Sequence, residues 1–249
     1  MRNALFALLI SFAALSTAGE PKLGQAGKDA HWEPTPQALV ETMLDLAKVT
    51  ARDYVMDLGS GDGRLVIAAA KRGARGLGIE YDAGLVELSR HVAKKEGVAG
   101  KAEFVKTDLF TADLSKATVI TLFLGERSNS RLRPKILSLK PGTRIVSNSF
   151  TMGNWEEDGK AVLTAAQGCK EKYCTAFLWI VPARIAGSYK LPQGELVLEQ
   201  EFQLLSGTLT TAGTTEPIVG GRVRAGEISF KAGGREYRGR MNGKTLELR

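Results

Sequence analysis

Three acidic residues stand at the ends of three apolar runs, the places where an open α/β sheet presents side chains to a ligand. Asp57 lies two residues before three alternating glycines, Glu80 ends the run 76–79, and Asp108 follows the run 102–105. A carboxylate after the second run can accept hydrogen bonds from both hydroxyls of a ribose. The three acids therefore suit a ligand that carries a cation, a ribose and an adenine, and suit a pyrophosphate poorly.

The alternating glycines occupy the turn between a predicted strand and a predicted helix. An apolar run over 54–58 predicts a buried strand, and an unbroken apolar run over 65–70 predicts a helix. Gly59, Gly61 and Gly63 lie between them, and glycine lets the backbone turn tightly and approach a ligand. The spacing G-x-G-x-G differs from the G-x-G-x-x-G of dinucleotide sites. The alternative, a glycine turn in another kind of α/β protein, does not account for the two later acids.

The glycine segment resembles the first motif of the class I (seven-strand) methyltransferases, which use S-adenosyl-L-methionine (SAM). This resemblance implies an α/β fold with a doubly wound, Rossmann-like seven-stranded sheet, and SAM as the cofactor. Further segments resemble the small protein-lysine methyltransferases that act on the mitochondrial ATP synthase c-subunit and adenine nucleotide translocase, and their bacterial relatives. These segments are Pro34-Thr35-Pro36, Asp108-Leu109-Phe110, Asn129-Ser130-Arg131-Leu132-Arg133-Pro134 and Pro141-Gly142-Thr143-Arg144-Ile145-Val146-Ser147.

The resemblance also implies roles for individual residues. Asp57 belongs near the methionine end of SAM, Glu80 on its ribose, and Asp108 with Leu109 around its adenine. The full set of expected cofactor-binding residues is Pro34, Thr35, Asp57, Gly59, Ser60, Gly61, Asp62, Glu80, Asp108 and Leu109. The candidates for the catalytic, acceptor side are Glu126, Asn129 and Trp155, for which loop solvation or rim packing is the alternative.

Two departures from the family pattern concern the acceptor. Gly125-Glu126-Arg127 stands where a more apolar loop is expected, and the relatives lack the C-terminal extension. We expect a protein substrate with a lysine side chain and no nucleic acid. The chain has no Asn-Pro-Pro-aromatic motif after the fourth strand, and no cysteine at a strand end of the crevice, which argues against two types of nucleic-acid methyltransferase.

The other elements follow from capping signals and periodicity. Thr35 as N-cap and Pro36 at the first helical position predict a helix whose apolar face covers the crevice. The remaining predicted elements are a helix after Asp82, strands over 117–124 and 143–149, a helix over 130–139, and a hairpin of 161–166 with 175–181.

The N-terminus predicts a secretory signal peptide over residues 1–18. Arg2 precedes an apolar stretch over 4–14, and Ser16 and Ala18 fit a cleavage site. The stretch has 11 residues, too short to span a bilayer comfortably. We therefore expect a periplasmic or secreted protein with no transmembrane span in the mature chain, although an uncleaved anchor and proximity to a membrane are compatible with the pattern.

Three further regions follow the signal peptide: a linker over 19–33, the methyltransferase domain over 34–186, and a small antiparallel β-meander over 187–249. Leu196, Leu198, Phe202 and Leu204 alternate as in a half-buried strand, and Gly233-Gly234 and Asn242-Gly243 predict hairpin turns. The last 30 residues contain eight Lys or Arg and three Glu. This basic excess fits a solvated outer face or a binding surface.

Composition permits one sizeable core and no metal centre. The 249 residues are 43% hydrophobic and carry a formal net charge of +7, and the two histidines and two cysteines match no zinc pattern. Cys169 and Cys174 are expected at the closed end of the last hairpin, as a disulfide in an exported chain or as free thiols otherwise.

Export and SAM chemistry conflict, because SAM is made in the cytosol. Two classes of function therefore remain open: a SAM-dependent methyltransferase, and an exported, catalytically silent binding or assembly module with the same fold. Function depends on the site and not on the fold.

Overall fold

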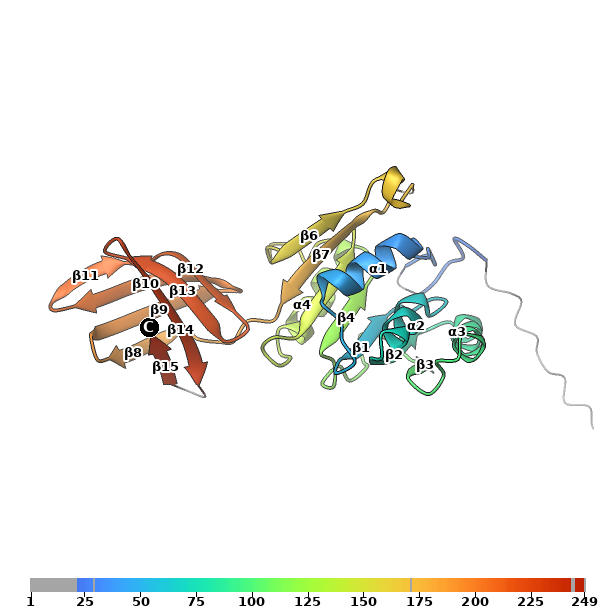
Figure 1. The fold of residues 1–249 in the computed structure, drawn as a ribbon, viewed down its shortest axis with the longest axis horizontal. Helices are drawn as coiled ribbons and strands as arrows, with labels where there is room; N and C mark the ends of the chain where they lie inside the picture. The colour runs from blue at the N-terminus through green and yellow to red at the C-terminus, as the bar shows by residue number, and fades with distance from the viewer. Residues whose placement is uncertain (1–21, 29, 171, 243–244, 249) are drawn as a thin grey trace, which may run out of the picture.

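The computed structural model describes residues 22–28, 30–170, 172–242 and 245–248 (Figure 1). The expected signal peptide and Gly243 of the second predicted turn lie outside the described residues. Within them, no helix combines the length and apolarity needed to cross a membrane.

The first sheet has seven strands in the order β3-β2-β1-β4-β5-β7-β6. Strand β7 is antiparallel to both of its neighbours, and the first five strands in this order run parallel. This arrangement confirms the predicted doubly wound sheet. The strand bounds are β1 Tyr54–Leu58, β2 Arg75–Glu80, β3 Ala102–Lys106, β4 Val119–Leu122, β5 Arg144–Asn148, β6 Gly159–Val162 and β7 Thr175–Ile180.

Helices cover both faces of this sheet because each buries one apolar stripe. Helices α1 (Gln37–Leu46) and α2 (Arg64–Lys71) pack on one face, α4 (Glu126–Ile136) packs on the other, and α3 (Ala83–Lys95) joins a smaller cluster around Phe104. The sheet itself is buried between these layers, as its apolar strands require.

Two helix starts differ from the prediction. The N-cap of α1 is Pro36 and not Thr35, because the Thr35 hydroxyl accepts a hydrogen bond from Asn148 Nδ2 at 3.3 Å and caps nothing. Helix α1 also stays clear of the crevice, which the residues just before it line instead. Helix α4 begins at Glu126 and contains Pro134 in its last turn, so Asn129 is helical and not in a loop.

The predicted last hairpin is present with a shorter first strand. Residues 165–167 form a 3₁₀ turn, so β6 ends at Val162 and not at Ala166. The disulfide between Cys169 and Cys174 is confirmed, with Cα atoms 5.8 Å apart.

The C-terminal residues form a second, antiparallel sheet with its own core, which confirms the predicted β appendage (Figure 1). Its strands follow the order β15-β14-β13-β12-β10-β9-β8, with β11 paired to β10. Their bounds are β8 Gly187–Leu191, β9 Gly194–Glu201, β10 Leu204–Thr211, β11 Thr214–Pro217, β12 Val219–Arg224, β13 Glu227–Ala232, β14 Arg235–Asn242 and β15 Thr245–Leu248.

One strand prediction in this region is wrong. The alternating residues 196–204 do not form a single strand, because the chain turns at Phe202, which has a positive φ of 52°. The turn places the Phe202 ring on Trp155 of the first domain, with ring centroids 5.9 Å apart. Gln203 Nε2 donates to the Glu156 carbonyl at 2.7 Å. The two sheets are therefore joined by specific side-chain contacts.

Candidate active site

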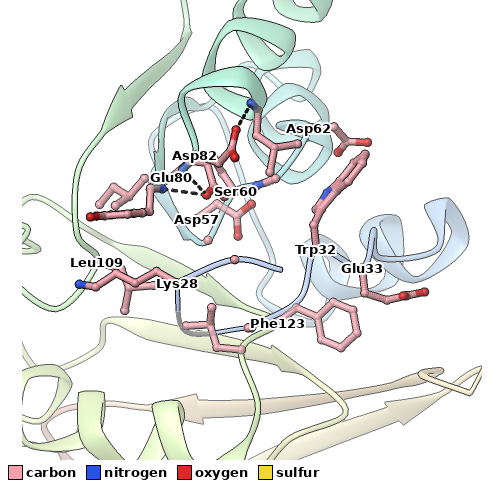
Figure 2. Close-up of a pocket in the computed structure, with 18 of the residues that line it drawn as sticks. Lys28, Trp32, Glu33, Asp57, Ser60, Asp62, Glu80, Asp82, Leu109 and Phe123 are labelled. Atoms are coloured by element: carbon pink, nitrogen blue, oxygen red, sulfur yellow. Dashed lines mark hydrogen bonds between the residues drawn. The ribbon is translucent and has the colours of Figure 1, made fainter. Parts of the chain in front are cut away.

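A cavity of about 380 Å³ opens at the carboxyl ends of β1, β2, β3 and β4 (Figure 2). Cavities of this size hold small ligands. Its wall combines the glycine turn, the residues that follow β2, β3 and β4, and residues 25–28 and 30–35. All ten residues expected to bind the cofactor line this cavity: Pro34, Thr35, Asp57, Gly59, Ser60, Gly61, Asp62, Glu80, Asp108 and Leu109.

The glycine turn needs glycine for both conformation and space. Gly59, Gly61 and Gly63 have positive φ angles of 78°, 53° and 81°. A Cβ on Gly61 would lie 2.7 Å from the Trp32 Nε1 atom, closer than a side chain permits. The turn thus brings bare backbone against the ligand cavity and starts α2 at Arg64.

The Glu80 carboxylate is fixed by three backbone donors. Its Oε2 accepts from the Gly61 N–H at 2.9 Å, and its Oε1 accepts from the N–H groups of Tyr81 at 2.7 Å and Asp82 at 2.9 Å. Oε1 already accepts two hydrogen bonds and Oε2 only one, so Oε2 retains capacity to accept from a ligand. Glu80 is therefore held ready to bind a ligand hydroxyl group through Oε2.

Asp57 lies beneath the cavity and is 3% exposed. Burial raises its pKa to about 7, with smaller increases from the charges of Glu80 and Asp62, while a hydrogen bond from Thr121 opposes the rise. That bond is 2.6 Å long. At neutral pH the carboxyl is divided between its neutral and ionised forms, so a cationic ligand would favour the ionised form.

Asp62 ties the glycine turn to the segment before α1. Its two oxygens accept from the Arg64 guanidinium, with the shortest N–O distance 2.6 Å. Arg64 Nη1 also donates to the Thr35 carbonyl at 2.6 Å. The ion pair therefore fixes Pro34 and Thr35 against the cavity.

At the far end of the cavity, Asp108 is paired with a lysine that the sequence did not suggest. Asp108 accepts from the Lys28 ammonium and from the Phe110 N–H, and the Lys28 bond is the main reason that the pKa of Asp108 is lowered. The Lys28 Nζ atom also lies 5.0 Å from the centroid of the Tyr81 ring. It thus stands between Tyr81 and Asp108, where the resemblance places adenine.

The donor and acceptor set of the cavity fits SAM. The acids Glu33, Asp57, Asp62, Glu80, Asp82 and Asp108 line it and favour a ligand with positive groups. The Ser60 hydroxyl lies in the same wall, buried and without a hydrogen-bond partner among the described residues.

The three acceptor-side candidates lie outside the cavity wall. Glu126 is exposed at the start of α4 and accepts from the Thr151 hydroxyl at 2.8 Å. Asn129 is fully buried and donates to Ser147 and to the carbonyls of residues 150 and 151. Trp155 is 1% exposed and packs in the core. The buried positions of Asn129 and Trp155 fit the packing alternative, and the roles of all three residues toward an acceptor stay predictions.

The sequence missed several wall residues, namely Lys28, Trp32, Glu33, Tyr81 and Phe123. The first three belong to the segment 19–33, which we predicted to be a linker because of its glycines and polar residues. An aromatic and an acid directly before Pro34 were the available signal. Phe123 lies within the apolar run of the predicted fourth strand, so its residue type does not distinguish it from the buried residues of that strand.

Comparison with known proteins identifies relatives over the first domain. A family described as "ANTKMT methyltransferase domain" matches residues 57–159. A protein-lysine N-methyltransferase of Saccharolobus islandicus (strain REY15A) is 39% identical over 151 residues, which are 59% of this chain and 91% of the relative. The adenine nucleotide translocase lysine N-methyltransferase of Mus musculus is 34% identical over 119 residues, 47% of this chain and 52% of that relative.

A solved structure is also similar to this chain. It is described as an RNA methyltransferase from Salinibacter ruber in complex with S-adenosyl-L-homocysteine (SAH), with 46% identity and a TM-score of 0.57. The match covers 61% of this chain and 96% of that chain. The names of these relatives thus give two kinds of acceptor, a protein lysine and RNA.

Proposed function

This chain belongs to the SAM-dependent methyltransferases of the ANTKMT type, and from this premise we propose that it methylates the side-chain amine of a protein lysine. The cofactor is SAM, which when bound supplies an electrophilic methyl group. The observation that carries the proposal is the acid-lined cavity at the strand ends, with Glu80 fixed by three backbone donors. The relative named for lysine methylation, matched over 91% of its length, supports the choice of acceptor.

Different residues of the cavity bind different parts of SAM. We assign the ribose to Glu80, the adenine to Asp108 and Leu109, and the methionine end to Asp57 and the glycine turn. The acceptor amine must be neutral to attack a methyl carbon, so it must lose a proton first. Glu33 is exposed in the cavity wall and makes no hydrogen bond or ion pair within the described part of the chain, so its carboxylate is available for that proton.

The test is methyl transfer from radiolabelled SAM to defined acceptors. One acceptor is a peptide pool with one central lysine and randomised flanks, and its control is the same pool with norleucine in place of lysine. A structured RNA transcript is tested separately as the other acceptor. We expect label on the lysine pool alone. Label on RNA alone, or SAH binding without any transfer, would overturn the lysine assignment.

We further propose that the protein is exported to the periplasm or the exterior, where methylation would depend on SAM that reaches this compartment from the cytosol. The apolar stretch over 4–14 with its flanking Arg2 supports this proposal, and so does the Cys169–Cys174 disulfide, since such bonds persist in oxidising compartments. Fractionation and intact mass of the native protein test it. A cytosolic protein that takes up two alkylating groups without reductant would contradict export.

A further inference from the structure

Three aromatic side chains form a cluster, and one of them, Phe123, lines the cavity. Phe123 follows β4, Phe150 follows β5, and Tyr173 precedes β7. The ring centroids are 6.0 Å apart for Phe123 and Phe150, 5.1 Å for Phe123 and Tyr173, and 5.7 Å for Phe150 and Tyr173. All three side chains are partly exposed, and Phe123 also lines the cavity (Figure 2). We name these three residues the aromatic trio.

The order of strands places the trio on the methyl side of the site. The residues assigned to adenine and ribose follow β3 and β2, and those assigned to the methionine end follow β1. The next strands in the sheet are β4, β5 and β7. A ligand that runs from β3 to β1 therefore directs its reactive end toward the trio.

The backbone holds Phe150 and Tyr173 in place by unusual means. Ser149 has a positive φ of 58°, and around it the Phe150 N–H donates to the Asn148 carbonyl at 2.7 Å. The Ser149 N–H donates to the Thr175 carbonyl at 2.7 Å, which joins this turn to the start of β7. Non-glycine residues with positive φ concentrate at functional sites.

Tyr173 is fixed by covalent structure, since it lies between Cys169 and Cys174 in the disulfide-closed loop. Its ring already lies near an ammonium group of this chain. The Nζ atom of the neighbouring Lys172 is 5.6 Å from the Tyr173 centroid, within the range of a cation–π contact. The Lys172 side chain is exposed, so a second ammonium can replace it from solvent.

We propose that the aromatic trio is the acceptor subsite, which packs the hydrocarbon stem of the incoming lysine and holds its ammonium by cation–π attraction at Tyr173 before the proton is lost and the neutral amine attacks. This inference rests on the proposed lysine methylation and specifies the residues that select the acceptor. Aromatic faces attract an ammonium and tolerate a methylene stem, so the trio favours lysine over acidic or neutral side chains.

The test separates acceptor binding from cofactor binding. Tyr173→Leu and Phe123→Leu retain apolar bulk and remove one ring each, and Tyr173→Phe restores the ring. Tyr237→Leu is the matched control, because Tyr237 is partly exposed and stacks on Phe230 in the second sheet. Kinetics use the lysine peptide pool, and calorimetry measures SAH affinity for each variant.

We expect both leucine variants at the trio to raise KM for the pool roughly tenfold, which is the loss of one cation–π or stacking contact. The SAH affinity of Tyr173→Leu, at a residue outside the cavity wall, should stay within about twofold. Tyr173→Phe and Tyr237→Leu should behave as wild type. Unchanged KM in both variants, or equal loss of SAH binding, would overturn the subsite.

If Tyr173→Leu fails to fold, Phe123→Leu and wild type with a reduced disulfide test the subsite in its place, since both should raise KM. Wild type that binds SAH and labels no lysine would contradict the proposed lysine methylation itself.

Discussion

At the scale of single residues, the buried carboxyl of Asp57 predicts a proton linkage. Its pKa is raised to about 7, and a cationic ligand above it favours the charged form. Binding of SAM at pH 7 should therefore release about half a proton. Calorimetry in two buffers with different ionisation enthalpies measures this release. Asp57→Asn should bind without it, and equal heats in both buffers for wild type would contradict the linkage.

The same group affects stability. Because the folded-state pKa is higher than the unfolded one, the folded protein binds more protons between about pH 4 and 7. The free energy of unfolding should therefore fall as the pH rises through this interval and level off above it. Asp57→Asn should remove this contribution to the slope in chemical denaturation. A wild-type curve that instead rises to pH 7 with an equal slope in the variant would count against a buried, protonated Asp57.

Among the side chains of the cavity, we expect the substitution of Glu80 to cause the largest single loss of cofactor affinity. Glu80→Ala should weaken SAH binding by about 1–3 kcal/mol, the cost of losing charge-assisted hydrogen bonds. Glu103→Ala is a suitable control, because Glu103 is exposed on β3. Unchanged affinity of the Glu80 variant in calorimetry would remove the ribose assignment.

At the scale of elements, the segment before α1 is part of the binding site. Lys28 contacts Asp108 and Tyr81 in the place assigned to adenine. Adenine must displace it, so Lys28→Ala should tighten SAH binding by up to about fivefold, the value of a partly exposed ion pair. Lys22→Ala on the same segment provides the control. Weaker binding by Lys28→Ala would show instead that Lys28 holds the ligand.

The elements also show which features of the fold and the site the sequence predicts and which it does not. Buried parallel strands are continuous apolar runs, so the sheet and the acids at its strand ends were predictable. A run gives no direction for the side chains that follow it, so the sequence does not show that Asn129 and Trp155 are buried outside the cavity wall. Segment 22–33 has no periodicity in its sequence. In the structure, Gly24 and Gln25 form backbone hydrogen bonds with Trp32, and Trp32 lies against Gly61.

At the scale of the whole molecule, the second sheet packs against the first through several side chains, among them Phe202 and Ala225. Among the described strands, none pairs between the two sheets, and each sheet has its own core. Trp155 stacks on Phe202 across the junction, and Ile185 belongs to the second core although it precedes β8. The basic excess of the C-terminus is partly neutralised here, since Arg222 pairs with Glu156 at 3.6 Å.

A chain that ends at Ala186 should therefore fold and bind SAH with reduced stability. We expect a loss of about 2 kcal/mol in the free energy of unfolding, because Trp155 loses an aromatic partner and Ile185 loses its core. Phe202→Leu in the full chain should reproduce part of this loss without changing SAH affinity. Thermal unfolding with and without SAH measures both effects. A truncated chain that is unfolded at 25 °C, or folded but unable to bind SAH, would show that the second sheet is an integral part of the methyltransferase and not an appendage.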